Sequence, residues 1–319
     1  MNALDKLETI FILAAITLGL IFGQAESFGK IASSLVGPLL VGMIFGVFLK
    51  IPLTEISRGF KNVKFALTSL GVNFLWIPIL GYGLSTVFLN DFLDLKIGFL
   101  MLLVTPCTDW YLIFTALAKG DVPLSTSILP LNLIVQLVLL PVYLFIFAGL
   151  NGAIQGGTLI ASVFWTLVVP LGASVLVKRF FAETGAFREG LAKIFENGVF
   201  VFLWLAILCM FAQEAKRLLS DLTQFKILFP PVILFFLVNF FVGRLVSRLA
   251  KFSRAQAVSL SMTTLARNSP VSLAVAVVAF PSRPDVALAL VIGPLIEIPV
   301  LFLVAKVLLI LGRERAEPV

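Results

Sequence analysis

The sequence contains no histidine and only two cysteines. Histidine is a common proton carrier and metal ligand at neutral pH, so its absence excludes histidine-ligated haem and catalysis by Ser–His or Cys–His pairs. Cys107 and Cys209 both lie in apolar runs, and they give neither a disulfide framework nor the spacing of a zinc site. No Walker A, GxGxxG or metal-ligand motif occurs, so nothing indicates ATP-driven pumping, and no cofactor is expected.

Charge is also scarce. Charged residues make up 13% of the 319 residues and hydrophobic residues 60%, with a mean hydropathy of +1.10. Soluble domains are about 45–50% apolar and about 25% charged, so this composition predicts a polytopic membrane protein with almost no extramembrane domain. Met1–Lys6 leads into the first apolar run without a small-residue cleavage pattern, so no cleaved signal peptide is predicted.

The apolar runs predict an all-α protein with ten transmembrane helices in a single domain, 1–319. At about 20 residues per span, the length leaves room for about ten spans with short connections. Helices are expected because a bilayer leaves open sheet edges unsatisfied and the runs do not alternate as barrel strands do. The predicted spans lie near residues 8–23, 31–49, 65–89, 97–118, 122–148, 158–177, 198–212, 227–249, 255–280 and 285–311.

The basic residues predict an orientation. With ten spans both termini lie on one side, and that side carries sixteen of the 24 Lys and Arg residues, against six on the other. The positive-inside rule then places both termini in the cytoplasm of a multi-pass protein of the cell membrane. The net charge of +7 is therefore explained by topology rather than by nucleic-acid binding. The segment 178–197 is expected to be an amphipathic cytoplasmic stretch on the membrane surface.

The second half of the chain repeats features of the first. Pro106 and Pro270, Asp121 and Asp285, and Pro130 and Pro294 are each separated by 164 residues. Because five spans per half cross the membrane in opposite directions, these matches predict an inverted five-plus-five repeat, about 1–150 and about 151–319, as in many secondary transporters.

Pro106 and Pro270 fall inside the fourth and ninth spans, which are predicted to break there. Interrupted spans at matching positions of two halves point to a transport site. We expect the half-helices that start at the two prolines to direct their N-termini, with free N–H groups, at a polar or anionic ligand. A simple kink at each proline is the other interpretation.

Three charged side chains lie deep in apolar runs, namely Asp109, Arg267 and Glu297. A charge there costs about 2.5–3.5 kcal/mol even on a lenient insertion scale, so such residues tend to be paired and functional. Glu297 is the candidate proton carrier, since burial favours its neutral form and Arg267 its charged form. Asp109 is a second candidate. A static ion pair of Arg267 with Glu297 or Asp109 is the structural alternative.

The predicted substrate-binding residues border the two breaks or face them. A thiol at a helix N-terminus favours the thiolate and soft ligands, which makes Cys107 a candidate, whereas Cys209 is expected to be inert. Asn132 in the fifth span ranks above the amides Asn73, Gln136 and Asn239, because it nearly matches Glu297 in the repeat. The full predicted set is Cys107, Thr108, Asp109, Asn132, Arg267, Asn268 and Ser269.

Several of these motifs resemble the arsenite efflux permeases, a branch of the bile acid/sodium symporter superfamily. The motifs are Pro106-Cys107-Thr108, Leu117-Ala118-Lys119-Gly120-Asp121, Ala266-Arg267-Asn268 and Gly293-Pro294-Leu295-Ile296-Glu297-Ile298-Pro299-Val300. The resemblance implies a core domain of spans 3–5 and 8–10 with crossed, broken fourth and ninth helices, and a panel domain of spans 1, 2, 6 and 7. It also implies arsenite export with Cys107 and Glu297 as functional positions and proton exchange as the coupling.

The sequence departs from that family in two places. Asp109-Trp110-Tyr111 follows the Cys-Thr pair where smaller, uncharged residues are expected. In the ninth-span break, where sodium-coupled relatives place an acid and an amide, this chain has Thr263, Thr264 and Arg267, and a fixed cation there argues against sodium.

The leading hypothesis is a proton-coupled exporter of arsenite or a similar small oxyanion or hydroxide, working by alternating access, and not an enzyme. The runner-up is a symporter of small organic anions, sodium-coupled or not, in which Arg267 and the helix ends hold a carboxylate. An intramembrane enzyme using Cys107, or a receptor or channel on the same fold, ranks lower. The expected partners are the small-molecule substrate, H⁺ rather than Na⁺ as coupling ion, and lipid.

Overall fold

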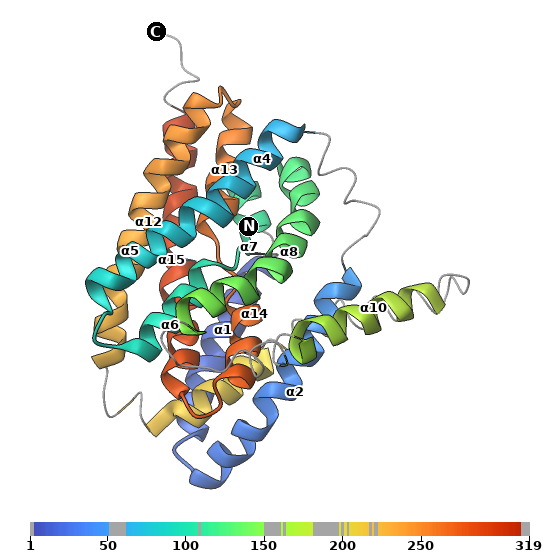
Figure 1. Cartoon of the computed structure of the whole chain (residues 1–319), viewed down its shortest axis with the longest axis vertical. Helices are drawn as coiled ribbons and strands as arrows, with labels where there is room; N and C mark the ends of the chain where they lie inside the picture. Colours follow the sequence, from blue (N-terminus) through green and yellow to red (C-terminus); the bar gives the residue numbers. More distant parts are fainter. Residues whose placement is uncertain are drawn as a thin grey trace.

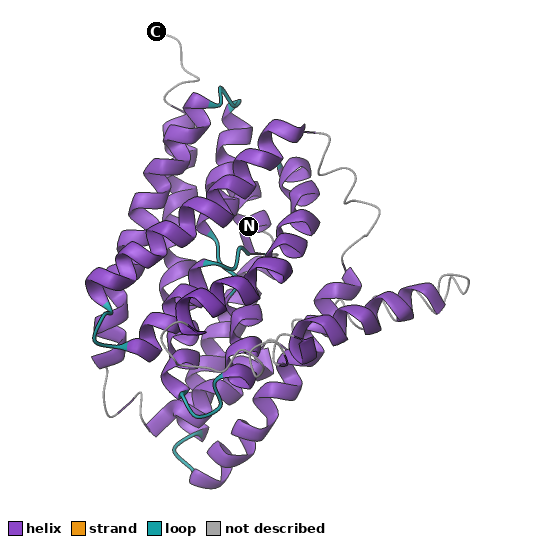
Figure 2. Ribbon diagram, viewed as in Figure 1, coloured by secondary structure: helices purple, strands orange, loops and turns teal. Residues whose placement is uncertain are grey.

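The structure is a computed structural model that describes residues 3–50, 62–107, 110–149, 164–180, 204–216 and 223–313, together with 161, 198, 201, 202 and 219. In this described part helices account for the regular structure, and no strand is present (Figures 1 and 2). The first half contains α1 (Ala3–Phe22), α2 (Glu26–Lys50), α4 (Val63–Gly71), α5 (Ile77–Phe88), α6 (Leu93–Leu103), α7 (Trp110–Leu117) and α8 (Val122–Leu144). The second half contains α10 (Val169–Phe180), α12 (Thr223–Leu249), α13 (Arg254–Leu265), α14 (Ser269–Ala279) and α15 (Pro284–Arg313). The π-helical turns are η3 (Val72–Trp76), η4 (Phe145–Gly149) and η5 (Phe164–Val168).

Five of the described helical stretches are long and apolar enough to cross a membrane. They are Glu26–Gly46, Val63–Phe88, Val122–Phe147, Thr223–Leu249 and Pro284–Leu311. Each coincides with one of the runs predicted to span the bilayer, which confirms a multi-pass membrane protein. Large apolar side chains on these helices remain exposed, among them Leu67, Leu75, Phe241 and Leu303. A surface of this kind is suited to lipid rather than water.

Helices α6 and α15 form the most extensively packed pair of described elements. Gly98 on α6 makes this possible, because a Cβ atom at that position would lie 2.4 Å from the carbonyl oxygen of Val286 on α15. Where both helices begin, Arg283 and Asp94 form an ion pair of 2.7 Å. The fourth and tenth predicted spans are therefore held in close contact, which fixes the position of residues that follow α6.

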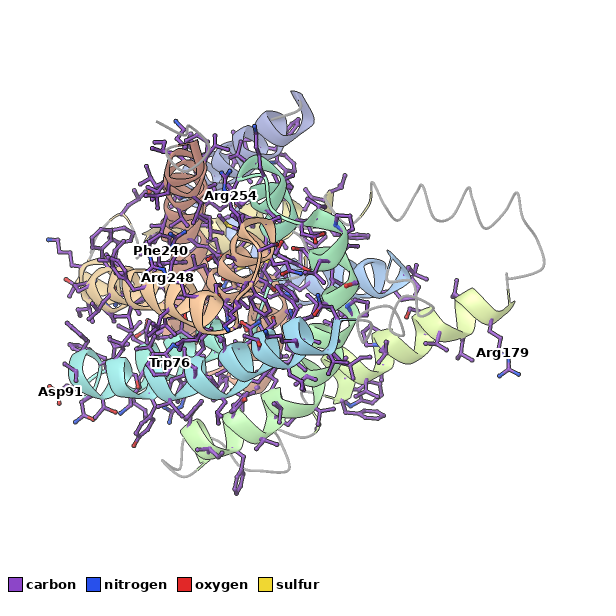
Figure 3. The ribbon with its side chains drawn as sticks, turned by 90° about the horizontal axis from the view of Figure 1, so that it is seen from above. Trp76, Asp91, Arg179, Phe240, Arg248 and Arg254 are labelled. Atoms are coloured by element: carbon purple, nitrogen blue, oxygen red, sulfur yellow. The ribbon has the colours of Figure 1, made fainter. Side chains whose placement is uncertain are left out.

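Two of the predicted spans are interrupted. Helix α6 ends at Leu103 and α7 begins at Trp110, while α13 ends at Leu265 and α14 begins at Ser269. By contrast, α12 and α15 run along most of the long axis of the molecule (Figure 1). Helix α10 extends away from the other helices, with Arg179 near its far end (Figures 1 and 3). The predicted amphipathic segment 178–197 lies almost wholly outside the described residues.

Candidate functional site

The two interrupted spans meet through their extended segments. Pro106 pairs with Arg267 as an isolated antiparallel bridge. The N–H of Cys107 donates to the carbonyl of Ala266 at 3.1 Å, and the N–H of Asn268 donates to the carbonyl of Thr105 at 2.7 Å. All six residues are buried. We call this paired region, residues 105–107 and 266–268, the crossing.

The two prolines occupy different positions in the crossing. Pro270 lies in the first turn of α14, where its missing N–H is tolerated. Pro106 lies in the extended segment that follows α6, where it forms the bridge with Arg267. The expectation that a half-helix starts at Pro106 is therefore wrong. Pro106 lies opposite Arg267 in the antiparallel pairing, whereas Pro270 lies beyond the crossing, in α14.

Hydroxyl side chains join the crossing to the neighbouring helix turns. The Oγ1 of Thr105 and the Oγ of Ser272 lie 2.7 Å apart, and the Ser272 hydroxyl donates to the carbonyl of Met101 at 2.9 Å. Asn268 is the N-cap of α14, and its side-chain oxygen accepts the N–H of Val271 at 3.2 Å. Because that cap takes one N–H and Pro270 has none, the α14 terminus presents fewer free donors than the sequence suggested.

Arg267 is the central side chain of the crossing and is only 2% exposed. Its Nη1 donates to the carbonyl of Leu103 at 2.8 Å, at the end of α6. Its Nη2 donates to the carbonyl of Thr264 at 2.8 Å and to the Oδ1 of Asn73 at 2.9 Å. Longer contacts of 3.4 Å reach the carbonyls of Thr263 and Leu265. The guanidinium thus binds the carbonyl ends of both α6 and α13, so the C-termini of these two helices converge at this side chain.

Glu297 reaches the crossing from α15 and is 4% exposed. Its Oε1 accepts the backbone N–H of Arg267 at 2.7 Å. Within the described part of the chain the Glu297 carboxylate and the Arg267 guanidinium form no ion pair, although the two charges are close enough to interact. The acid is therefore bonded to the backbone of the crossing rather than to its cation.

Cys107 is buried, at 3% exposure, and lies near enough to Arg267 for an electrostatic interaction. Cys209 is equally buried in the helical stretch 204–216, and neither cysteine is in a disulfide. Among the described residues no three His, Cys, Asp or Glu side chains gather as a metal site would require. Thr108 and Asp109, two of the predicted binding residues, lie outside the described residues.

Four buried amides surround the crossing or lie near it. Asn73 binds the Arg267 guanidinium, and Asn239 on α12 donates to the carbonyl of Thr264. Asn132 on α8 donates to the Oγ1 of Thr263 at 3.3 Å, while its Oδ1 and both amide atoms of Gln136 have no partner among the described residues. Asn132 therefore contacts α13 one turn before the break, but Asn73 makes the more direct contact with the crossing.

An apolar cavity of about 150 Å³ lies beside the crossing. One wall is formed by Ile16 of α1, Leu40 of α2 and the stretch 206–211, and the other by α14 and α15 from Ser269 to Pro299. Ser269 is 2% exposed, and its hydroxyl has no partner among the described residues. It is the only hydroxyl on an otherwise apolar lining. Neither Cys107 nor Glu297 lines this cavity.

A larger, polar hollow of about 630 Å³ lies along the same pair of walls, toward the α1–α2 and α14–α15 connections. It is lined by Glu26, Lys30 and Ser33 of α2, by residues 212–216, and by residues 277–287 at the α14–α15 turn. The two hollows follow one another along α14, from Leu273 to Val277. We call the larger one the vestibule.

Residues 37–221, more than half of the chain, match the model of the Sodium Bile acid symporter family. The chain belongs to this family. The matched region includes the extended segment 105–107 of the crossing, with Cys107, but ends before Arg267 and Glu297. Family members are transporters, so the chain is a multi-pass membrane transporter.

Characterized and uncharacterized relatives extend the family match over nearly the whole chain. The Arsenical-resistance protein Acr3 of Corynebacterium glutamicum is 26% identical over 335 aligned positions, which cover 98% of this chain and 90% of that protein. Acr3 of Alkaliphilus metalliredigens is 25% identical and covers 95% of this chain and 91% of its own length. An uncharacterized transporter of Synechocystis is 20% identical over 96% of this chain and 88% of its own length.

The sequence did not identify every residue of the crossing. Thr105 and Ser272 were not singled out, although both are polar residues within an apolar span. Asn73 was ranked below Asn132, yet it reaches the guanidinium from a π-helical turn, a distortion that is frequent at functional sites of proteins. A polar side chain in an apolar run was the available signal in each case.

Proposed function

We propose that the protein exports arsenite in exchange for protons by alternating access. One observation carries this proposal. Two consecutive residues of the crossing are held by the two candidate functional residues: Ala266 by the N–H of Cys107, and Arg267 by the carboxylate of Glu297. A change in the protonation of Glu297 therefore alters a hydrogen bond to the extended segment 266–268, to which Cys107 is also bonded.

The chemistry of the crossing suits trivalent arsenic. Thiolate is a soft ligand that selects soft, thiophilic centres, and Cys107 is the thiol in the crossing. Arsenous acid is an uncharged trihydroxide near neutral pH, so it needs no counter-charge. The adjoining cavity, apolar apart from the Ser269 hydroxyl, fits a small neutral solute with hydroxyl groups. Two relatives are named for arsenical resistance, which supports the same substrate.

The competing hypothesis of an organic-anion symporter depended on Arg267 as the partner of a carboxylate. In the structure all three guanidinium nitrogens donate to oxygens of the chain itself. An anion binding there would have to displace several buried hydrogen bonds, each of which is costly to leave unmade. This geometry favours the uncharged substrate.

Alternating access requires two bodies that rock against each other around a central site. The cavity and the vestibule both lie between α1, α2 and 206–216 on one side and α14 and α15 on the other. This division supports a panel of spans 1, 2, 6 and 7 and a core of spans 3–5 and 8–10, within a ten-span inverted repeat. Movement at this seam would open and close the vestibule.

The charges at the two ends support cytoplasmic termini. Exposed basic residues gather at the end that carries the α12–α13 turn, where Figure 3 labels Arg248 and Arg254. Lys64 at the start of α4 and Lys119 and Lys251 on connections are exposed at that same end. The opposite end mixes Lys30 and Lys216 with Glu26 and Asp91. By the positive-inside rule the vestibule then opens to the outside.

The test is arsenite flux in proteoliposomes with an imposed pH gradient, with and without sodium. We expect flux that follows the pH gradient and ignores sodium. Cys107→Ala should abolish it, whereas Cys209→Ala, which removes the other buried thiol, should keep it. Flux that requires sodium, or undiminished flux in Cys107→Ala, would overturn the proposal.

A further inference from the structure

The oxygens around the Arg267 guanidinium form a nearly closed cage. Four are main-chain carbonyl oxygens, from Leu103 at the end of α6 and from residues 263–265 at the end of α13. The fifth is the Oδ1 of Asn73, contributed by η3. The face of the Phe235 ring lies 5.8 Å from the guanidinium carbon. All of these groups are uncharged, and the residues that carry them are buried.

Uncharged oxygens in this arrangement attract cations. Each helix C-terminus carries roughly half a negative charge, and here two such ends converge on one point inside the predicted membrane region. In transporters, the carbonyl ends of half-helices and unwound backbone coordinate sodium or protons. A buried group of five oxygens without a donor or cation would be strongly unfavourable. The chain supplies the missing charge from its own side chain.

We infer that this cage is a monovalent-cation site whose permanent occupant is the guanidinium of Arg267. Arg267 is then a positioning residue: it joins the ends of α6 and α13 and so holds the crossing on which Cys107 and Glu297 act. The transport cycle needs no free cation at this position, because the cation is covalently attached. The transport consequence rests on the proposed function, but cation binding by the cage does not.

Removal of the side chain should therefore create a site for a free cation. In Arg267→Ala the five oxygens lose the guanidinium donors, although the Thr264 carbonyl keeps the Asn239 amide, and a space the size of the arginine side chain opens beside them. Guanidinium fits this space best, since it restores the planar donor pattern, and sodium is a second ligand for carbonyl oxygens. Choline is too large and has no N–H donor.

The experiment compares thermal unfolding of purified wild type and Arg267→Ala in about 20 mM guanidinium, sodium or choline chloride at equal ionic strength. We expect the Tm of Arg267→Ala to be at least about 3 °C higher in guanidinium than in choline, with sodium intermediate. The wild type should shift by less than about 1 °C. Equal Tm values in all three salts would contradict the proposal.

A second pair of variants separates charge from packing and remains informative if the alanine variant does not fold. Arg267→Lys and Arg267→Met place unbranched side chains in the cage, with and without charge. We expect the lysine variant to fold, to unfold at the higher temperature and to transport without sodium. A methionine variant as stable and as active as the lysine variant, or a lysine variant that fails to fold, would contradict the proposal.

The transport arm distinguishes this inference from the proposed function. Arsenite flux by Arg267→Ala should fall at least about tenfold in choline and recover at least in part when guanidinium or sodium is supplied. If the wild type transports no arsenite, the proposed function is wrong, while the Tm shifts still show whether the cage binds a cation. If the wild type transports arsenite and the Tm of Arg267→Ala is the same in all three salts, only the inference of a cation site is wrong.

Discussion

The carboxylate of Glu297 accepts the backbone N–H of Arg267 at 2.7 Å, across 30 residues of chain. This bond joins α15 to the extended segment 266–268. The carbonyl of Ala266 in the same segment accepts the N–H of Cys107. A protonated carboxyl is a weaker acceptor than a carboxylate. In the proposed mechanism, proton binding at Glu297 would weaken this bond and loosen the extended segment 266–268, and loss of the proton would tighten it again. We regard this coupling as the core of the transport cycle.

Glu297→Gln should stop coupled transport while leaving the protein folded. The carboxamide oxygen of glutamine can still accept the Arg267 N–H, so the Tm should stay within a few degrees of wild type, but glutamine does not titrate. We expect pH-driven arsenite flux to fall at least about tenfold in proteoliposomes, a change of about 1.4 kcal/mol in the barrier. Asp91→Asn, which removes an exposed acid between α5 and α6 that lines neither the cavity nor the vestibule, is the control and should keep full flux.

Gly98→Ala should destabilise the protein through the contact of α6 with α15. The added methyl would lie 2.4 Å from the Val286 carbonyl and 2.7 Å from the Ala289 Cβ, so the helices must separate. Overpacking of this kind costs about 1–3 kcal/mol. Gly83→Ala on α5, where a Cβ meets nothing within 4 Å, should leave the Tm unchanged or raise it slightly. Equal Tm values for the two variants would show that α6 and α15 do not pack as described.

Two asparagine caps allow stability and function to be separated. Asn268 caps α14 at the crossing, and Asn62 caps α4 by accepting the N–H of Phe65. Alanine at either position should cost about 0.5–2 kcal/mol, measured by thermal unfolding. Arsenite flux should fall in Asn268→Ala alone, because only that cap orients the crossing. A similar loss of flux in Asn62→Ala would mean that flux follows stability rather than the geometry of the site.

Cysteine labelling should establish the sidedness of the vestibule. Ser33→Cys introduces a thiol into the vestibule, and Lys251→Cys introduces one at the basic end, while both native cysteines are buried. A membrane-impermeant maleimide added to intact cells should label Ser33→Cys only, and Lys251→Cys should react only after permeabilisation. The reverse pattern would invert the proposed orientation.

Much of the fold could be predicted from composition and proline placement. The five long helices follow from apolar runs, and the interruptions near Pro106 and Pro270 follow from the missing N–H of proline. Cys107, Arg267, Asn268 and Glu297 could be selected because each is polar in an apolar run. These are properties of single positions or of local sequence.

The orientation of the Arg267 side chain could not be predicted, because its hydrogen-bond partners are mainly backbone carbonyls, which have no sequence signature. Its contact with Asn73 joins residues 194 positions apart and depends on the π-helical turn η3. The different positions of Pro106 and Pro270 likewise depend on tertiary pairing. Pro106 pairs with Arg267 in the crossing, whereas Asn268 caps a helix that begins directly before Pro270.

The most direct test of proton exchange is the proton movement driven by arsenite alone. Liposomes containing the protein and a pH-sensitive dye are loaded with arsenite and diluted into arsenite-free buffer of the same pH. We predict that arsenite leaving the lumen draws protons in, so that the lumen acidifies in wild type and in Cys209→Ala but not in Cys107→Ala or Glu297→Gln. Arsenite efflux by the wild type without any change in lumenal pH would contradict the mechanism.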